Sequence, residues 1–221
     1  MGIMREALRL RYALLPYWYT LAWQAHRTGT PLVRPLFWDD STDAGLSTVD
    51  DAFLLGDALL VAPVVEEGVT ARRVRLPAGH WYATDDEESF TGGRDVIVGA
   101  PLDRIPVFAR AGSVVPMDEG GRTVLHLWWP ADGAAPGGAL YLDGNDGYGP
   151  WRYERFAVAH QDGAMEMTRT VEGDHPEPAE GFDLRVRGAT AAMAVVDGVE
   201  LAGPGPWKLP KGWTRVRIAK A

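Results

Sequence analysis

The segment that most constrains the fold is an apolar stretch near the N-terminus, residues 3–28, whose central part reads LRLRYALLPYWYTLAWQAHR. Leucine and alanine are frequent in it and predict a helix, and Gly29 and Pro31 mark the end of that helix. Pro16 removes one backbone donor, so we expect the helix to be kinked or divided there. Polar residues are few in its second half, and such a helix is expected to be covered by other structure.

The rest of the chain is typical of short β-strands joined by turns. Its 221 residues contain 26 glycines and 16 prolines, which are many for a helical protein. Residues 174–181 are rich in proline and glutamate and are expected to form an exposed loop. Apolar or alternating runs that predict strands cover residues 31–38, 57–65, 71–82, 94–101, 104–117, 123–130, 138–149, 153–161, 164–173, 182–188, 191–198 and 213–220.

This pattern predicts a mainly β protein, in which an N-terminal helix is followed by two tandem antiparallel β-sandwich domains. We expect residues 1–29 to form the helical segment and residues 30–117 to form the first sandwich. DEGGR, residues 118–122, is interpreted as a linker or tight turn. The second sandwich is then expected over residues 123–221.

Composition excludes several classes of function. The net charge of −8 argues against a nucleic-acid partner, because phosphate contacts need a basic surface. The absence of cysteine excludes disulfides, zinc–thiolate sites and thiol catalysis. No apolar run approaches the roughly 18 residues of a membrane span, and no secretory signal is recognisable. We therefore expect no membrane association and favour the cytoplasm, with the compartment left open.

Neither the histidines nor the clustered carboxylates have the pattern that a metal site or a glycosidase site requires. The histidines share no ligand spacing, so we expect no metal site and no cofactor. A glycosidase needs two carboxylates held across the scissile bond by rigid elements, whereas the acids here cluster in hydrophilic turns, where solvation explains them. The residues in question are His26, His80, His126, His160, His175, Asp39, Asp40, Asp43, Asp50, Asp51, Asp85, Asp86, Glu87 and Glu88.

One segment, LDGNDGYGPWRYE (142–154), has some features of a calcium loop. Asp143, Asn145 and Glu154 occupy its first, third and twelfth ligand places. Gly147 and Tyr148 stand where a ligand and a glycine are expected, so we favour a hairpin turn without a metal.

The nine tryptophans raise the possibility of carbohydrate stacking. Trp18 and Trp23 lie in the apolar helix and are expected to pack in a core. Trp128 and Trp129 are adjacent, so in a strand they face opposite sides and one of them could be exposed. Trp151 follows a turn and is the other candidate platform.

The order of the segments resembles the C-terminal part of glycoside hydrolase family 31, the family of α-glucosidases and α-xylosidases. The resemblance rests on LRLRYALLPYWYTLAWQAHRTGTPLVRPLFW, DDAFLLGDALLVAPVVEEG, RRVRLPAGHWY and APLDRIPVFARAGSVVPM, in this order. The later LYLDGNDGYGPWRYERF is similar to a hairpin in the family's last β-domain. The similarity is strong over residues 5–117, moderate over residues 122–160 and faint beyond them.

The resemblance implies that residues 3–28 are the last helix of a (β/α)8 barrel and that the two sandwiches are the proximal and distal C-terminal domains. The family's catalytic nucleophile and acid/base are aspartates on barrel strands, and neither motif occurs in this sequence. We therefore expect no catalytic, substrate-binding or metal-binding residue in this chain, and no activity of the chain alone.

Three functions follow as hypotheses. The first is the non-catalytic C-terminal portion of a retaining α-glycosidase, which supports a barrel absent from this chain. The second is a free-standing carbohydrate-binding module. The third is a subunit that assembles with a separately encoded catalytic barrel through the 3–28 helix. The exposed apolar helix also predicts self-association.

Overall fold

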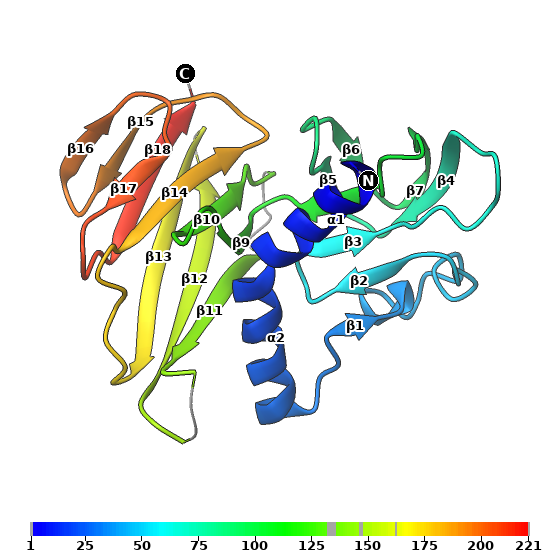
Figure 1. Cartoon of the computed structure of the whole chain (residues 1–221). Coiled ribbons are helices and arrows are strands. Elements are labelled where there is room, and N and C mark those ends of the chain that lie inside the picture. Colours follow the sequence, from blue (N-terminus) through cyan, green and yellow to red (C-terminus); the bar gives the residue numbers. More distant parts are fainter. Residues whose placement is uncertain (1, 132–135, 146–147, 162, 221) are drawn as a thin grey trace.

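The computed structural model describes residues 2–131, 136–145, 148–161 and 163–220, and it confirms a mainly β chain with its helices at the N-terminus (Figure 1). Helix α1 spans Gly2–Ala13 and helix α2 spans Leu15–Thr28, so the predicted division of the helix near Pro16 is confirmed. Pro16 lies in the first turn of α2, where its missing N–H costs no intrahelical bond. Gly29 ends α2 in a left-handed conformation, and its N–H donates to the carbonyl of Ala25 at 2.8 Å.

The first β-unit contains a six-stranded sheet in the order β1-β2-β3-β8-β5-β6 and a separate ribbon of β4 and β7. Leu54, Leu60, Trp81 and Phe108 of the sheet share a core with Val74 and Leu76 of the ribbon, so the two pieces pack face to face. The strands are β1 Val33–Arg34, β2 Phe53–Leu55, β3 Leu59–Val61, β4 Ala71–Leu76, β5 His80–Ala83, β6 Ser89–Thr91, β7 Arg94–Gly99 and β8 Val107–Arg110.

The strand expected over residues 31–38 is much shorter than predicted. Strand β1 covers only two residues, and a 3-10 turn, η1, follows at Leu36–Trp38. Pro35 separates the two, because proline has no N–H to contribute to a strand ladder.

The second β-unit is one ten-stranded sheet in the order β16-β15-β18-β13-β12-β11-β9-β10-β14-β17. Nine of these strands contribute apolar side chains to one core, so the sheet folds around it as a sandwich does. Two neighbouring pairs, β9 with β11 and β10 with β14, are parallel, and the other pairs are antiparallel. The strands are β9 Ser113–Asp118, β10 Thr123–Trp128, β11 Gly137–Asp143, β12 Trp151–Gln161, β13 Ala164–Gly173, β14 Phe182–Arg187, β15 Ala191–Val196, β16 Val199–Ala202, β17 Trp207–Leu209 and β18 Arg215–Lys220.

Residues 118–122, expected as a linker or tight turn, form the tight turn of the hairpin that joins β9 to β10. Strand β9 therefore belongs to the second sheet, although the sequence-based division places it in the first sandwich. The chain passes between the sheets at Ala111 and Gly112. Gly112 has φ of 79°, and a Cβ there would lie 2.5 Å from Cδ of Pro136, so this passage requires glycine.

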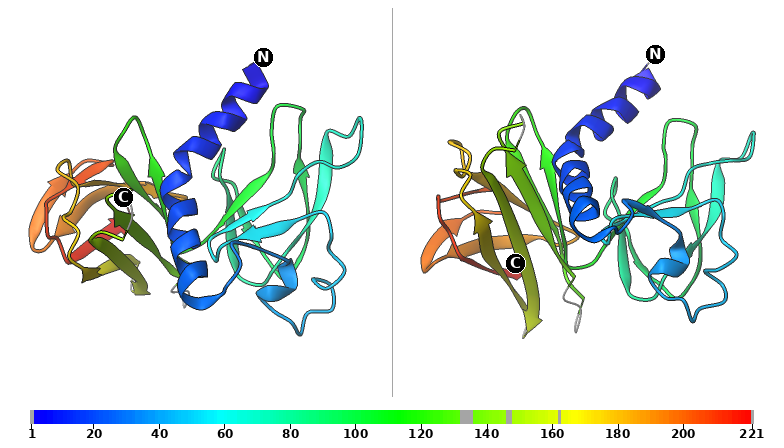
Figure 2. Two further views of the ribbon diagram at one scale, coloured as in Figure 1. Left: turned by 60° about the horizontal axis from the view of Figure 1, so that its bottom comes forward. Right: turned by 90° about the horizontal axis from the view of Figure 1, so that it is seen from below.

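Helix α2 lies between the two β-units (Figure 2). Leu14, Tyr17 and Leu21 share a core with Leu55 and Leu59 of the first unit. The same core includes Val115, Trp128 and Met117 from β9 and β10 of the second unit. The helix thus acts as a spacer whose two sides are each covered by a different sheet.

The two β-units also touch directly beside the helix. The rings of Tyr82 and Trp128 stack with centroids 5.8 Å apart. Glu87 forms an ion pair with Arg187, whose Nε lies 2.9 Å away, and accepts from the N–H of Gly188 at 2.7 Å. Gly188 has φ of 76° and lies against the ring of Tyr82, so a side chain there would separate the two units.

Candidate functional site

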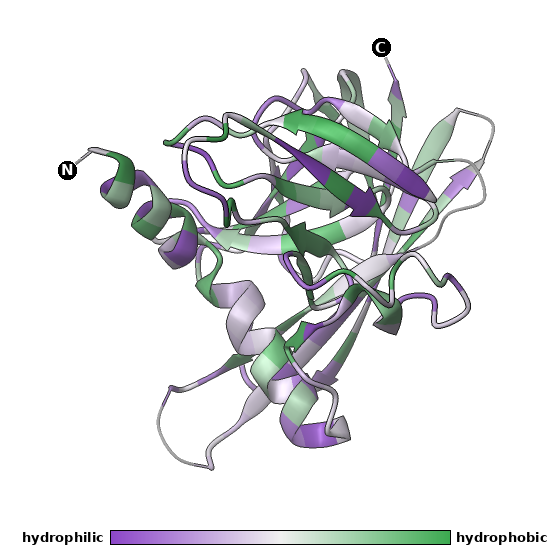
Figure 3. Ribbon diagram, turned by 90° about the vertical axis from the view of Figure 1, so that its right-hand side faces the viewer, coloured by the Kyte–Doolittle hydropathy of each residue, from purple (hydrophilic) through white to green (hydrophobic). Residues whose placement is uncertain are grey.

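Helix α1 is the most unusual surface of the molecule, because none of its residues is buried. Figure 3 shows it projecting away from the sheets with hydrophobic segments along its length. Met4, Leu8 and Tyr12 are spaced by four residues, so they share one face, and Arg5 and Arg9 lie beside them along a shallow groove. The exposed large apolar side chains of the two helices are Ile3, Met4, Leu8, Leu10, Tyr12, Leu15 and Tyr19.

The expectation that the whole 3–28 segment is covered by a barrel needs correction for its second half. Helix α2 is partly covered by the sheets of this chain itself, with Leu15 and Tyr19 still exposed, whereas no residue of α1 is buried. The sequence shows apolar residues along both helices, but it does not show which of them the following β-units bury.

Hydrogen bonds fix α2 to the first β-unit through Tyr17. Its hydroxyl donates to the carbonyl of Leu55 at 2.8 Å and accepts from the N–H of Ala58 at 3.3 Å. Burial of this hydroxyl raises the pKa of Tyr17. The same hydroxyl lies over Gly56, where a Cβ would be only 2.3 Å away.

Three further hydrogen bonds fix α2 to the β11–β12 hairpin. Thr20 Oγ1 accepts from the N–H of Tyr141 at 2.9 Å, and Gln24 Nε2 donates to Tyr153 Oη at 2.9 Å. Tyr19 Oη donates to Asp143 at 2.6 Å, and this bond raises the pKa of Tyr19 to about 12.

Aromatic rings reinforce the same junction around Trp23. Its ring stacks on Tyr153 with centroids 4.1 Å apart and on Tyr141 at 5.2 Å, and Trp151 lies tilted at 5.7 Å. Arg27 covers the Trp23 ring at 5.7 Å. Trp23 and Trp151 therefore join a helix to a sheet. This confirms the packing role expected for Trp23 and gives Trp151 one that the sequence did not predict.

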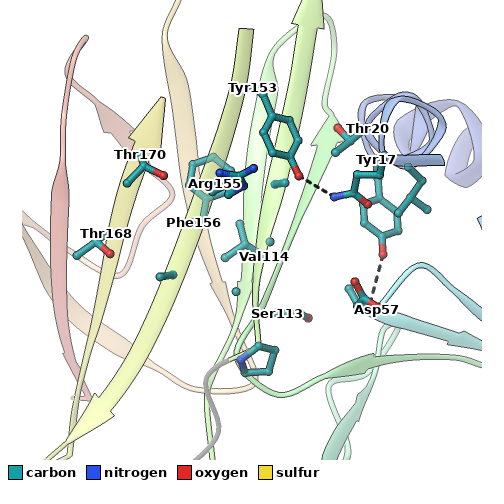
Figure 4. A pocket seen from close by; sticks show the side chains of 18 residues that line it. Tyr17, Thr20, Asp57, Ser113, Val114, Tyr153, Arg155, Phe156, Thr168 and Thr170 are labelled. Atoms are coloured by element: carbon teal, nitrogen blue, oxygen red, sulfur yellow. Dashed lines mark hydrogen bonds between the residues drawn. The ribbon is translucent and has the colours of Figure 1, made fainter. Parts of the chain in front are cut away.

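A cleft of about 420 Å³ lies between α2, the first β-unit and the outer face of β11, β12 and β13. Figure 4 shows Thr168 and Thr170 on one side of it and Tyr17 and Asp57 on the other, with Arg155 between them. Sequence reasoning missed this cleft, because its walls come from segments far apart in the chain. Its floor contains small residues, namely Gly137, Gly138, Ala139 and Ala157.

Six carboxylates of the two acidic loops are paired with arginines rather than with one another. Asp43 binds Arg75 at 2.8 Å, and this guanidinium holds the pKa of Asp43 below its usual range. Hydrogen bonds from Thr42 likewise lower the pKa of Asp40. The other pairs are Asp39 with Arg110, Asp51 with Arg72, Asp85 and Asp86 with Arg104, and Glu87 with Arg187.

The three residues of the calcium-like segment are engaged in different ways. Asp143 accepts from Tyr19 and from the N–H of Asn145, as in a turn. Glu154 is fully buried and points into the core side of the sheet, where Arg152 and Arg169 bind it. Gly147 lies outside the described residues. Glu154 is therefore committed to arginines, which favours the hairpin interpretation of this segment.

Buried charges continue from Glu154 into the segment 174–181, which was predicted to be an exposed loop. Glu177 is largely buried, forms an ion pair with Arg169 at 3.1 Å and accepts from the N–H of Gly212 at 3.0 Å. Glu177 thus ties this loop onto the sheet, so the predicted loop is present but only part of it is exposed.

The described histidines are dispersed. His126 is buried and binds Glu119 at 2.9 Å, and burial lowers the pKa of His126 to about 4 despite that partner. His80 Nδ1 lies 3.1 Å from the carbonyl of Phe90, and His160 packs edge-on to Trp129. Within the described ranges, no group of three or more histidine, aspartate and glutamate side chains could hold a metal ion. No described helix is long and apolar enough to span a membrane.

Trp128 and Trp129, one of which could have been exposed, are both buried. Their rings do face opposite sides of β10, but both sides are covered, by the α2 junction and by the core of the second sheet. Trp18 is half-buried and packs against the core that α2 shares with the two β-units. Phe37 and Trp38, in a segment predicted to be a strand, are instead adjacent exposed aromatic residues in η1.

Known proteins resemble both the sequence and the fold. Residues 29–115 match the model of the glycosyl hydrolase family 31 C-terminal domain. An alpha-glucosidase of Hordeum vulgare is 37% identical over 185 residues, which are 76% of this chain and 21% of that protein. Neutral alpha-glucosidase AB of Homo sapiens is 44% identical over 116 residues, which are 52% of this chain and 12% of that protein. The chain thus spans about a fifth or less of these curated relatives.

Solved structures give the same result. A dextranase of Flavobacterium johnsoniae superposes with a TM-score of 0.86 at 24% identity, over 99% of this chain and 33% of that one. An alpha-xylosidase of Xanthomonas citri superposes with a TM-score of 0.71 at 27% identity, over 96% of this chain and 24% of that one. The fold of this chain and its similarity to these proteins together identify it as the C-terminal β-domains of a glycoside hydrolase. The chain belongs to glycoside hydrolase family 31, as the C-terminal part of that family's proteins.

Proposed function

We propose that this chain is the non-catalytic C-terminal portion of a retaining α-glycosidase and that it supports a catalytic (β/α)8 barrel. The observation that carries the proposal is the contrast between the two helices: α2 is held by both β-units, whereas α1 exposes Met4, Leu8 and Tyr12. An exposed apolar face on α1, a helix that precedes the anchored α2 directly, is typical of an interface.

Helix α1 is also basic. Arg5, Arg9 and Arg11 stand against a single acid, Glu6, which pairs with Arg9. The barrel surface that receives α1 should therefore be apolar with acidic residues at its rim. In this proposal the chain contributes no catalytic, substrate-binding or metal-binding residue, and the barrel cleaves the α-linked glycoside through a covalent glycosyl-enzyme.

The first test is the activity of the purified chain. We expect no hydrolysis of p-nitrophenyl α-glucoside or α-xyloside above a mock preparation. The second test supplies a family 31 barrel in trans and measures co-purification and hydrolysis.

Variant Leu8→Asp should abolish co-purification and the gain in activity, because it places a charge in the apolar face. Variant Val199→Asp, at an exposed apolar position on β16, is the matched control and should have no effect. Turnover by the chain alone, or equal loss in both variants, would contradict the proposal.

A further inference from the structure

The cleft between α2 and the second sheet is a built cavity that the support of a barrel does not use. Side chains on β12 and β13 alternate, so Phe156 and Met167 point into the core while Arg155 and Thr168 point into the cleft. Helix α2 forms the opposite wall with Tyr17, whose position is fixed by its hydrogen bonds to Leu55 and Ala58. The exposed face of α1 takes no part in this cavity.

The cleft presents hydrogen-bonding groups that the described residues leave available. The hydroxyls of Thr168 and Thr170 have no hydrogen-bond partner among the described residues. Gln24 uses its amide nitrogen on Tyr153 and keeps its carbonyl oxygen for another donor. Asp57 pairs with Arg34 through one oxygen, while its carboxylate remains largely exposed at the rim.

The charges and the shape of the cleft favour a neutral, polyhydroxylated ligand. Arg155 and Asp57 carry opposite charges, so the lining of the cleft has no net charge that would select an anion or a cation. Hydroxyl, carboxamide, guanidinium and carboxylate groups together match sugar hydroxyls, each of which both donates and accepts. The floor of glycine and alanine lets a ring approach the backbone, and about 420 Å³ lies within the range of small-ligand sites.

Recognition here would rest on hydrogen bonds more than on stacking. The Tyr153 ring is covered by Trp23 on one side, and Arg155 lies over it at 5.0 Å, so no free aromatic face lines the cleft. We propose that this cleft binds one pyranose unit of a neutral sugar. The proposal is independent of α1 and of the barrel, and an open site with few hydrogen bonds predicts a dissociation constant of about 1–10 mM.

Saturation-transfer difference NMR tests the proposal on the full chain, with D-glucose and maltose as probes. We expect saturable transfer from the unmodified chain. Variant Ala157→Phe fills the floor of the cleft without removing a polar group and should weaken binding at least about tenfold. The double variant Thr168→Val/Thr170→Val removes two hydroxyls at constant shape and should weaken binding by about tenfold.

Two controls make the result specific. Thr91→Val removes a threonine hydroxyl on exposed strand β6, and Trp38→Ala removes one of the two exposed aromatic side chains of η1; neither should change the affinity. Valine and phenylalanine suit strand positions, and unchanged circular dichroism would verify that each variant is folded. Absence of saturable transfer would overturn the proposal. So would binding that survives Ala157→Phe, or binding that is lost with Trp38→Ala.

Discussion

The buried ion network around Glu154 predicts that loss of Arg169 is among the most damaging single changes in the second β-unit. Arg169 is 1% exposed and Glu154 is 0% exposed. Arg169 Nε lies 2.8 Å from one Glu154 oxygen, and its terminal nitrogen donates to the other at 2.9 Å. The guanidinium also lies over the rings of Phe182 and Trp213, at 5.5 and 5.1 Å.

Variant Arg169→Met keeps the length of the side chain and removes its charge. Glu154 then retains only Arg152, and Glu177 loses its closest cation. Breaking a buried pair by removing one partner costs about 3–5 kcal/mol. For a chain of this size, that corresponds to a fall in Tm of roughly 6–20 °C.

Urea unfolding followed by tryptophan fluorescence measures this loss, and calorimetry gives the Tm. The matched control is Arg155→Met, whose pair with Glu172 on the same two strands is half-exposed and should cost at most about 1 kcal/mol. The double variant Glu154→Leu/Arg169→Met should be more stable than the single Arg169→Met variant, because it leaves no uncompensated buried carboxylate. A loss below about 1 kcal/mol for Arg169→Met would refute the reasoning.

Three other predictions address the helices and the buried histidine. Tyr17→Phe should lower the free energy of unfolding by about 1–3 kcal/mol in urea, because Leu55 and Ala58 lose a buried partner, whereas Tyr12→Phe on exposed α1 should not. The pKa of His126 is lowered to about 4 in the folded chain, so its contribution to the stability of the fold is fully present above pH 6.5 and is lost as pH falls toward 4. We expect the free energy of unfolding to fall by about 3 kcal/mol between those pH values, as measured by urea titrations at several pH values. The variant His126→Gln should reduce this dependence on pH, and an unchanged dependence would contradict the role given to His126. The chain should self-associate through α1 in sedimentation velocity, and Met4→Asp/Leu8→Asp should return it to a monomer; oligomers that persist in this variant would place the contact elsewhere.

Local signals in the sequence were sufficient for the parts of the fold that depend on neighbouring residues. Pro16 and Gly29 set the ends of α2 through backbone chemistry alone, and the alternation in Ala71–Leu76 predicted strand β4. The assignment of β9 to a sheet could not be predicted in this way. Its partners β10 and β11 are chosen by the packing of the whole second unit, and DEGGR (118–122) is compatible with either a linker or a hairpin.

The candidate sites show the same limit. Glu154 looks like one acid of a polar turn in the sequence, but strand alternation directs it into the core, where it binds Arg169 of the neighbouring strand, fifteen positions further along. Trp128 and Trp129 are both buried because β10 is covered on both faces, a property of the tertiary structure. The cleft has walls from α2, β9 and β13, so no window of the sequence contains it.

The position of α2 between the two β-units has a consequence for synthesis on the ribosome. Its hydrogen bonds to the β11–β12 hairpin join residues 124 and 129 positions apart, as in Tyr19 with Asp143 and Gln24 with Tyr153. At about 5–20 residues per second, the side of α2 that faces this hairpin waits roughly 6–25 s for its cover. During that interval α2 exposes an apolar surface on the nascent chain. The speed at which the hairpin is translated therefore sets how long aggregation can compete with folding.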